Sequence, residues 1–323
     1  MTVVEIPPGA HSAAHTAGRW LGGRFRLDER ISTDDQVSGP CGSSWEARGL
    51  SLWKATDRLL GRPVTIYLLP PGVPVPGTVA DAVQSAAKVS DPRLATIYDT
   101  DFDPRCPYIV AEWTPGTHLE DLVLSGPCPP ALPQPALAAA MIADAADALA
   151  VAHRAGRPHL RLTPRSVRWS HGSGLKITGL GLDAALCGVI AEDPVAADTT
   201  ALARMLYALL TGYWPGDEPT ALPPAPRRKG QVCTPRQVRA GVPAILDAIT
   251  YRALRGQAAD APLRPQTPAG LAMALRMVQR PSYRLERPEP EPVIRPEVRR
   301  RQARHARARA GSGHRITLLR PAV

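Results

Sequence analysis

Apolar residues recur with helical spacing in the second half of the chain. The stretch that starts at Asp198 places its large apolar residues on one helix face and closes at Gly212. An alanine-rich stretch over 135–155 ends with two cations, and a glycine follows at 156. Both patterns predict helices. Proline at first-turn positions predicts further helices that start near residues 243 and 268.

Shorter patterns lie earlier in the chain. Residues 78–88 predict a helix with Thr78 as its N-cap. Residues 108–112 predict a strand, which a turn over 113–116 follows. The chain holds 36 prolines, and the proline-rich stretches at 70–76 and 126–135 are typical of surface connections.

Composition bounds the class of protein. The first 21 residues contain several Ala, Pro, Gly and His and are predicted to be a flexible leader. They lack the long apolar core of a signal peptide. No run of 18 apolar residues is present, so we expect no membrane span. The five cysteines form no C-x-x-C pair, which argues against zinc and thioredoxin-type sites and favours a reducing cytoplasm.

Positive charge is concentrated at the end of the chain. Residues 281–323 carry a net charge of +7 out of +10 and are rich in proline, which predicts a disordered basic tail. A cluster of arginines suits an anionic surface such as the inner face of the plasma membrane: Arg299, Arg300, Arg301, Arg304, Arg307 and Arg309. Nucleic acid is disfavoured, because no aromatic residue lies in 299–323 to stack on bases. A solvated tail with no ligand is the alternative.

Two short segments carry the chemistry. Residues 159–166 read His-Leu-Arg-Leu-Thr-Pro-Arg-Ser, and Gly179-Leu180-Gly181 follows. They resemble the protein-kinase catalytic loop H-R-D-L-K-P-x-N and metal loop D-F-G. The residues at the four reactive positions differ from those of kinases, and they are Arg161, Thr163, Ser166 and Gly179. A guanidinium cannot accept a proton and glycine offers no oxygen ligand, so the sequence predicts no metal site and no cofactor.

Segments that precede these loops in the sequence also resemble parts of protein kinases. Residues 23–31 and 52–69 resemble the first three strands of bacterial Ser/Thr kinases, in which a V-A-I-K lysine grips the phosphates. Here Tyr67 occupies the position of that lysine, and the helix at 78–88 lacks the glutamate that would pair with it. Only 17 residues separate Gly181 from Asp198, about half of the activation segment that the resemblance implies, and no A-P-E triplet is present.

The resemblance implies an α+β, two-lobed protein-kinase-like fold over residues 22–280. It also implies structural roles for His159, Asp198 and Arg264. The sequence is similar to a degenerate group of actinobacterial kinase-like domains linked to the peptidoglycan-precursor (lipid II) flippase. That likeness implies a scaffold, phosphorylated by a true kinase and bound by a forkhead-associated protein or an envelope-synthesis protein.

We therefore expect a catalytically inactive pseudokinase and no enzyme activity. Two alternatives remain: a weakly active or atypical Ser/Thr kinase that binds ATP through unorthodox metal ligands, and a basic nucleic-acid-associated protein. Asp183 could be a shifted metal ligand. Its place just after the glycines favours a surface or helix-start residue instead.

Overall fold

The computed structural model describes residues 16–31, 50–72, 75–125, 132–255 and 265–278. All of these belong to one compact unit, residues 1–280. Arg264 and the arginine cluster at 299–309 lie outside the described residues, so the predictions made for them stay predictions.

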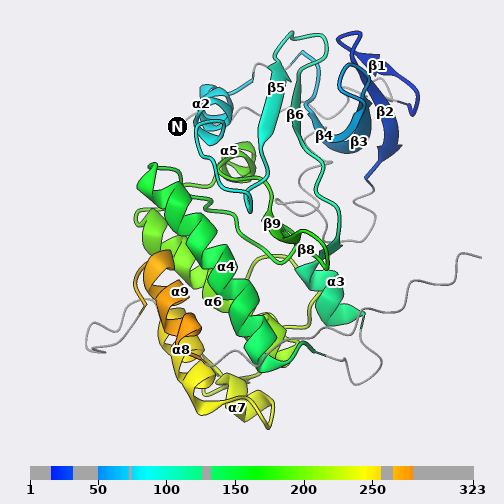
Figure 1. Ribbon diagram of the computed structural model, residues 1–323. Coiled ribbons are helices and arrows are strands. Elements are labelled where there is room, and N and C mark those ends of the chain that lie inside the picture. Colours follow the sequence, from blue (N-terminus) through cyan, green and yellow to red (C-terminus); the bar gives the residue numbers. More distant parts are fainter. Residues whose placement is uncertain (1–15, 32–49, 73–74, 126–131, 256–264, 279–323) are drawn as a thin grey trace, which may run out of the picture. The chain divides into compact units, whose positions relative to one another are not determined.

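The first part of the unit is a curled antiparallel sheet with strand order β1-β2-β3-β4-β6-β5 (Figure 1). Its strands are β1 (Trp20–Leu21), β2 (Phe25–Arg30), β3 (Ser51–Asp57), β4 (Arg62–Leu68), β5 (Ile97–Asp101) and β6 (Tyr108–Glu112). Leu21 is buried and pairs with Phe25 across β1 and β2. The leader predicted over residues 1–21 is therefore too long, since its last two residues belong to the sheet.

The two faces of the sheet bury different residues. Val64, Ile66 and Leu68 of β4 pack into one apolar cluster with the neighbouring strands. Tyr67 points to the opposite face and packs with two helices, α2 (Gly77–Ala86) and α5 (Leu182–Cys187). Because side chains alternate along a strand, β4 supplies both clusters at once. The Thr78 cap was predicted wrongly: α2 begins at Gly77, with Pro76 as its N-cap.

The second part is mainly helical (Figure 1). Its helices are α3 (Leu119–Leu124), α4 (Pro135–Arg154), α6 (Pro194–Thr211), α7 (Pro235–Val238), α8 (Ala244–Leu254) and α9 (Pro268–Arg276). A small sheet joins β7 (Thr117–His118), β8 (Val167–Ser170) and β9 (Gly174–Ile177), and a hairpin joins β10 (Arg227–Arg228) and β11 (Gln231–Val232). The bridge between Leu94 and Ile177 connects the helical part to the chain that enters β5.

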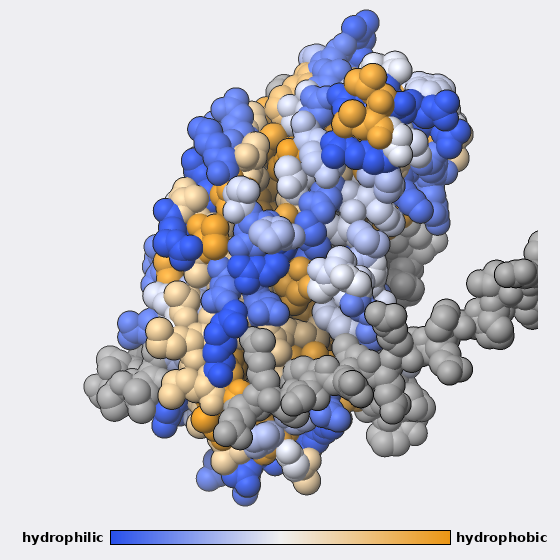
Figure 2. All heavy atoms as spheres, viewed as in Figure 1, coloured by the Kyte–Doolittle hydropathy of each residue, from blue (hydrophilic) through white to orange (hydrophobic). Residues whose placement is uncertain are grey.

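Helix α4 lies at the centre of the helical part, in contact with α6 and α9. Among the described residues it is the one helix long and apolar enough to cross a membrane, but most of that stretch is buried inside the domain. On the face shown in Figure 2, apolar side chains are interspersed with hydrophilic ones over this half. The composition of α4 is therefore that of a core helix.

Helix α6 begins earlier than the sequence predicted. Asp193 is its N-cap and accepts a hydrogen bond from Ala196 N, and Pro194 occupies the first turn. Asp198 lies inside the helix with its side chain fully buried. This frees Asp198 from any capping role, so that its carboxylate can serve the loop beside it.

Candidate functional site

The loop over 159–166 is held in place by Asp198. The Oδ1 atom of Asp198 accepts a hydrogen bond from Leu160 N at 2.7 Å, and Oδ2 accepts from His159 N at 2.7 Å. His153 Nε2 lies 2.8 Å from the same Oδ2. Leu160 has φ +62°, a left-handed conformation that non-glycine residues rarely adopt. These contacts stabilise that conformation and support the structural role predicted for Asp198.

His159 links this loop to the strand before the glycine loop. Its Nε2 lies 2.9 Å from Thr178 O, and its Nδ1 accepts from Arg161 N at 3.3 Å. One nitrogen thus donates and the other accepts, as a neutral imidazole requires. Burial lowers the pKa of His159, in agreement with that neutral form. The ring acts as a fixed spacer between the two loops.

Ser166 and Thr163 close the end of the loop upon itself. Ser166 Oγ accepts from Thr163 N at 2.8 Å and lies 3.1 Å from Thr163 O. The backbone carbonyl of Ser166 accepts from Thr178 N at 2.8 Å. Both side chains are buried. The Ser166 hydroxyl is therefore committed to the turn, and this geometry does not fit the metal-ligand role that kinases give to this position.

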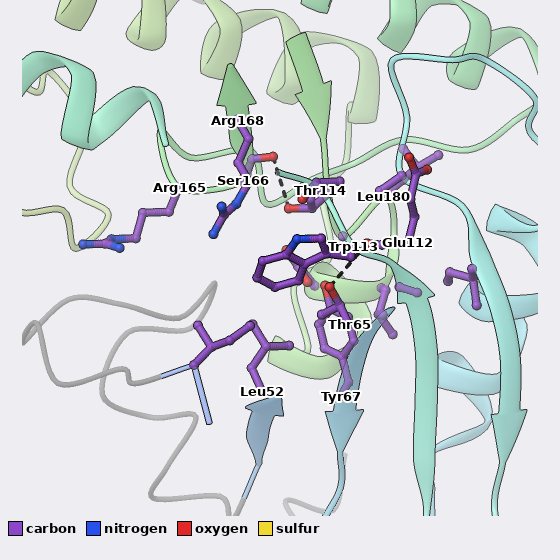
Figure 3. Close-up of a pocket in the computed structure, with 18 of the residues that line it drawn as sticks. Leu52, Thr65, Tyr67, Glu112, Trp113, Thr114, Arg165, Ser166, Arg168 and Leu180 are labelled. Atoms are coloured by element: carbon purple, nitrogen blue, oxygen red, sulfur yellow. Dashed lines mark hydrogen bonds between the residues drawn. The ribbon is translucent and has the colours of Figure 1, made fainter. Parts of the chain in front are cut away.

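A cleft lies between the sheet and these loops (Figure 3). Thr65 and Tyr67 reach it from β4, and Ser166 and Arg168 reach it from the side of the loop. Trp113, directly after β6, lies between these two groups. Apolar side chains complete much of the wall: Ile31, Leu52, Ala95, Ala111, Leu180 and Leu182.

The replaced positions do not all meet in this cleft. Tyr67, Thr163, Ser166 and Gly179 line it. Arg161 does not, because it lines a separate hollow beside the first turns of α6. Its charge nevertheless acts on the Asp183 carboxyl, because it opposes the rise that burial causes in the pKa of that group. That Arg161 brings positive charge to the metal position therefore stays a prediction.

Tyr67 is buried and uncharged. Desolvation raises the pKa of its phenol well above the ordinary value, and the nearby Asp183 adds to that effect. The hydroxyl therefore stays protonated at neutral pH, as predicted from the residue type.

A different cation occupies the cleft. Arg168 donates from Nη1 to Gly116 O at 2.8 Å, and its Nη2 lies 2.8 Å from His118 Nε2. Its guanidinium also lies 5.7 Å from the centre of the Trp113 ring. No ion pair of Arg168 with a carboxylate occurs in the part of the chain that the structure describes. Nothing in the sequence singles out this residue, since an arginine inside a short strand gives no local signal of where it points.

His118 helps to fix that arginine. Its Nδ1 lies 2.6 Å from Arg165 O, so the ring donates there and accepts from Arg168 with Nε2. Burial, with the charges of Arg168 and Arg165, lowers the pKa of His118 to about 3. The ring is consequently neutral over the physiological range and behaves as an acceptor for Arg168.

Two carboxylates line the cleft, and their surroundings differ. Glu112 Oε1 forms an ion pair with Lys176 Nζ at 2.5 Å, and Glu112 Oε2 accepts from Thr96 N at 3.2 Å. The Asp183 carboxyl is buried, and its Oδ1 has no hydrogen-bond partner. Desolvation raises the pKa of Asp183 well above the ordinary value, opposed by the charge of Arg161.

The prediction for Asp183 was half right. It does lie at a helix start, in the first turn of α5, but it is buried and lines the cleft. Its apolar neighbours Leu182 and Ala184 were the available sign of a buried turn. Among the described residues no three Asp, Glu, His or Cys side chains gather as a metal cluster. A metal here would therefore depend on oxygen atoms from a ligand as well.

Comparison with known proteins gives a consistent set of relatives. No profile of a known family matches the chain. It is 28% identical over 200 residues to the serine/threonine-protein kinase PknB of Mycobacterium leprae, covering 53% of this chain and 31% of that protein. It is 30% identical over 155 residues to a probable serine/threonine-protein kinase of Corynebacterium efficiens, covering 45% and 23%. It is 28% identical over 201 residues to the serine/threonine-protein kinase PknL of Mycobacterium tuberculosis, covering 55% and 49%.

These relatives correct one prediction and confirm another. The matches cover less than one third of PknB and about half of PknL. Each is named as a kinase, which contradicts the expectation that the chain is no enzyme. The curled sheet and the helices agree with the same relatives. The chain therefore has a two-lobed, kinase-like α+β fold and is similar to bacterial serine/threonine protein kinases.

Proposed function

We propose that the chain is an atypical serine/threonine protein kinase that binds a nucleotide in the cleft and transfers its terminal phosphoryl group slowly. The observation that carries this proposal is the anchored loop over 159–166, which retains its Asp198 and His159 contacts beside a cleft with an apolar wall. The kinases similar to this chain supply the reaction class.

The reaction tolerates the residues found here. Phosphoryl transfer depends mainly on positioning and on neutralising charge, with little covalent chemistry for the protein to perform. Loss of a general base costs on the order of 10²–10⁴ in rate, which leaves a slow reaction rather than none. Arg161 cannot be that base, because its guanidinium stays charged. The serine or threonine hydroxyl of a substrate would therefore lose its proton to solvent or to the phosphoryl group.

The cleft offers separate surfaces for the two ends of a nucleotide. One wall of the cleft is apolar and includes Leu52, Ala111 and Leu180. The base of a nucleotide can pack against this wall. Arg168 supplies a half-buried positive charge that its neighbours hold in place without neutralising it. A fixed guanidinium binds phosphate oxygens in a two-pronged geometry. Arg168 thus serves the proposed function in place of the ammonium that Tyr67 lacks.

Nucleotide binding followed by phosphate incorporation tests the proposal. We expect ATP to raise the melting temperature of the protein, and labelled γ-phosphate to appear on the protein or on a generic substrate. The variant Arg168→Gln should weaken nucleotide binding by about tenfold, the range for one charge-assisted contact. Arg105→Gln is the matched control, since Arg105 is 89% exposed and pairs with Asp103 away from the cleft.

Two outcomes would contradict the proposal. The first is no stabilisation by ATP at millimolar concentration. The second is phosphate incorporation that Arg168→Gln and Arg105→Gln affect equally, which would point to a contaminating kinase.

The predicted contact with an anionic membrane surface concerns the basic tail, which lies outside the described residues. Binding to a forkhead-associated protein, to an envelope-synthesis protein or to an anionic membrane surface stays a prediction. The full chain should sediment with anionic vesicles, whereas a variant that lacks residues 299–309 should stay in the supernatant. Equal sedimentation of both would remove the membrane prediction.

A further inference from the structure

The Asp183 carboxyl lacks the contacts that normally accompany burial. Its side chain is 96% buried, and its Oδ1 faces no hydrogen-bond donor although it lines the cleft. A buried carboxylate without a donor is costly, so structural carboxylates are normally surrounded by them. Asp198 shows how this chain satisfies such a group, with three donors around one carboxylate.

The backbone holds Asp183 in this position. Asp183 N donates to Gly179 O at 3.1 Å in the turn that starts α5. Leu182 and Leu186 of the same helix pack into the cluster that contains Tyr67, Val79 and Ile109. The helix cannot withdraw the carboxyl from the cleft without exposing those leucines. Its orientation is therefore a product of tertiary packing.

Gly179 makes room for the carboxyl. A Cβ atom built on Gly179 would lie 2.0 Å from Asp183 Oδ2 and 2.2 Å from its Cγ. The Asp183 carboxyl thus fills the volume where a side chain of residue 179 would begin. Gly179 also has φ +75°, a conformation that favours glycine. The Asp183 oxygens thus lie where the first side-chain carbon of residue 179 would stand.

We propose that Asp183 is the protein ligand of a divalent cation of the magnesium class, which it holds in the cleft together with the phosphates of a bound nucleotide. This inference rests on the proposed function. Magnesium in phosphoryl-transfer sites is held by one or two carboxylates, by waters and by substrate phosphates, so a single carboxylate suffices. Glu112 cannot compete, because Lys176 and Thr96 already occupy its oxygens. When bound, the cation neutralises phosphate charge.

The test measures binding without measuring activity. A non-hydrolysable ATP analogue is titrated into the protein by calorimetry, with Mn²⁺ and then with a chelator. We expect Mn²⁺ to tighten binding of the analogue by at least about tenfold, the effect of one good charge-assisted contact. Asp183→Asn should abolish that gain while leaving metal-free binding within about twofold. Asp103→Asn, an exposed aspartate outside the cleft, should behave as wild type.

The outcomes separate the two proposals. If the analogue binds and Asp183→Asn keeps the full Mn²⁺ effect, the metal-ligand role is overturned and the proposed function survives. If the analogue fails to bind under any condition, both proposals fall. Paramagnetic resonance of Mn²⁺ with the analogue gives a second readout, and Asp183→Ser provides a second variant should the asparagine protein not fold. Loss of the Mn²⁺ effect in either folded variant supports the role.

Discussion

Two buried aspartates near the same cleft have opposite surroundings. Asp198 accepts hydrogen bonds from two backbone amides and contacts His153, so that both of its oxygens are engaged. Asp183 reaches the cleft with an oxygen that has no donor. The first carboxylate fixes a loop, and the second is buried at the wall of the cleft with one oxygen that makes no hydrogen bond. Burial alone therefore does not reveal the role of a charged residue, whereas the partners of its oxygens do.

Removal of Asp198 should have the largest effect. In Asp198→Ala the amides of His159 and Leu160 lose their acceptor, and nothing holds Leu160 in its left-handed conformation. We expect a loss of about 4 kcal/mol in the free energy of unfolding, measured by urea denaturation. Asp193→Ala on the same helix removes only a cap and should cost about 1 kcal/mol. Similar losses for both variants would show that Asp198 does not anchor the loop.

Gly179→Ala should have the next largest effect. The added Cβ meets the Asp183 carboxyl, and alanine is strained at φ +75°. A loss of about 2 kcal/mol is expected from the two causes together. In an Asp183→Ala background the steric part disappears, so the same substitution should cost clearly less. A cost that does not change between the two backgrounds would mean that the two residues do not compete for space.

Asp183→Asn should change stability in the opposite direction. It removes a buried, unpartnered carboxyl, and we expect a gain of about 1.5 kcal/mol at neutral pH from unfolding curves. The pKa of Asp183 is raised in the folded protein, so the folded state binds more protons than the unfolded state above pH ~4. Wild-type stability should therefore fall relative to the variant as pH rises from that value. A pH-independent difference would contradict the raised pKa.

Ser166→Ala should have the smallest effect. The hydroxyl closes the turn with Thr163, so its loss should cost about 1 kcal/mol. Because that hydroxyl is committed to the protein, the effect of Mn²⁺ on nucleotide binding should not change. A lost Mn²⁺ effect in this variant would move the metal-ligand role from Asp183 to the loop over 159–166.

Local patterns predicted the elements better than they predicted the cleft. The strand at 108–112 and the helix that ends at Arg154 follow from residue spacing and stop signals, which are local. The neutrality of Tyr67 follows from residue type. The place of Arg161 and the burial of Asp183 depend instead on how the loop turns and how α5 packs on the sheet. Spacing along the chain contains neither of these contacts.

Position 179 shows the limit most clearly. When the sequence is aligned with the kinase metal loop D-F-G, glycine at this position indicates that the metal-ligand carboxylate is lost, because no side chain remains. In space the same glycine is what admits another carboxyl. A comparison by position shows only a missing side chain, while in the folded chain the Asp183 carboxyl lies where the Cβ atom of residue 179 would stand. Only the tertiary structure can distinguish replacement from loss.

The alanine-rich composition of α4 sets how the domain tolerates mutation. Small side chains supply little apolar area, so the neighbouring helices must approach closely to exclude water. Truncation is costly mainly where α4 buries a large side chain, as at Ile142 and Leu149. Enlargement is harmful, since a bulkier residue at Ala145, Ala146 or Ala148 would force the neighbouring backbones apart. The helix that a hydropathy scan would assign to a bilayer is thus one whose buried alanines leave little room for a larger side chain.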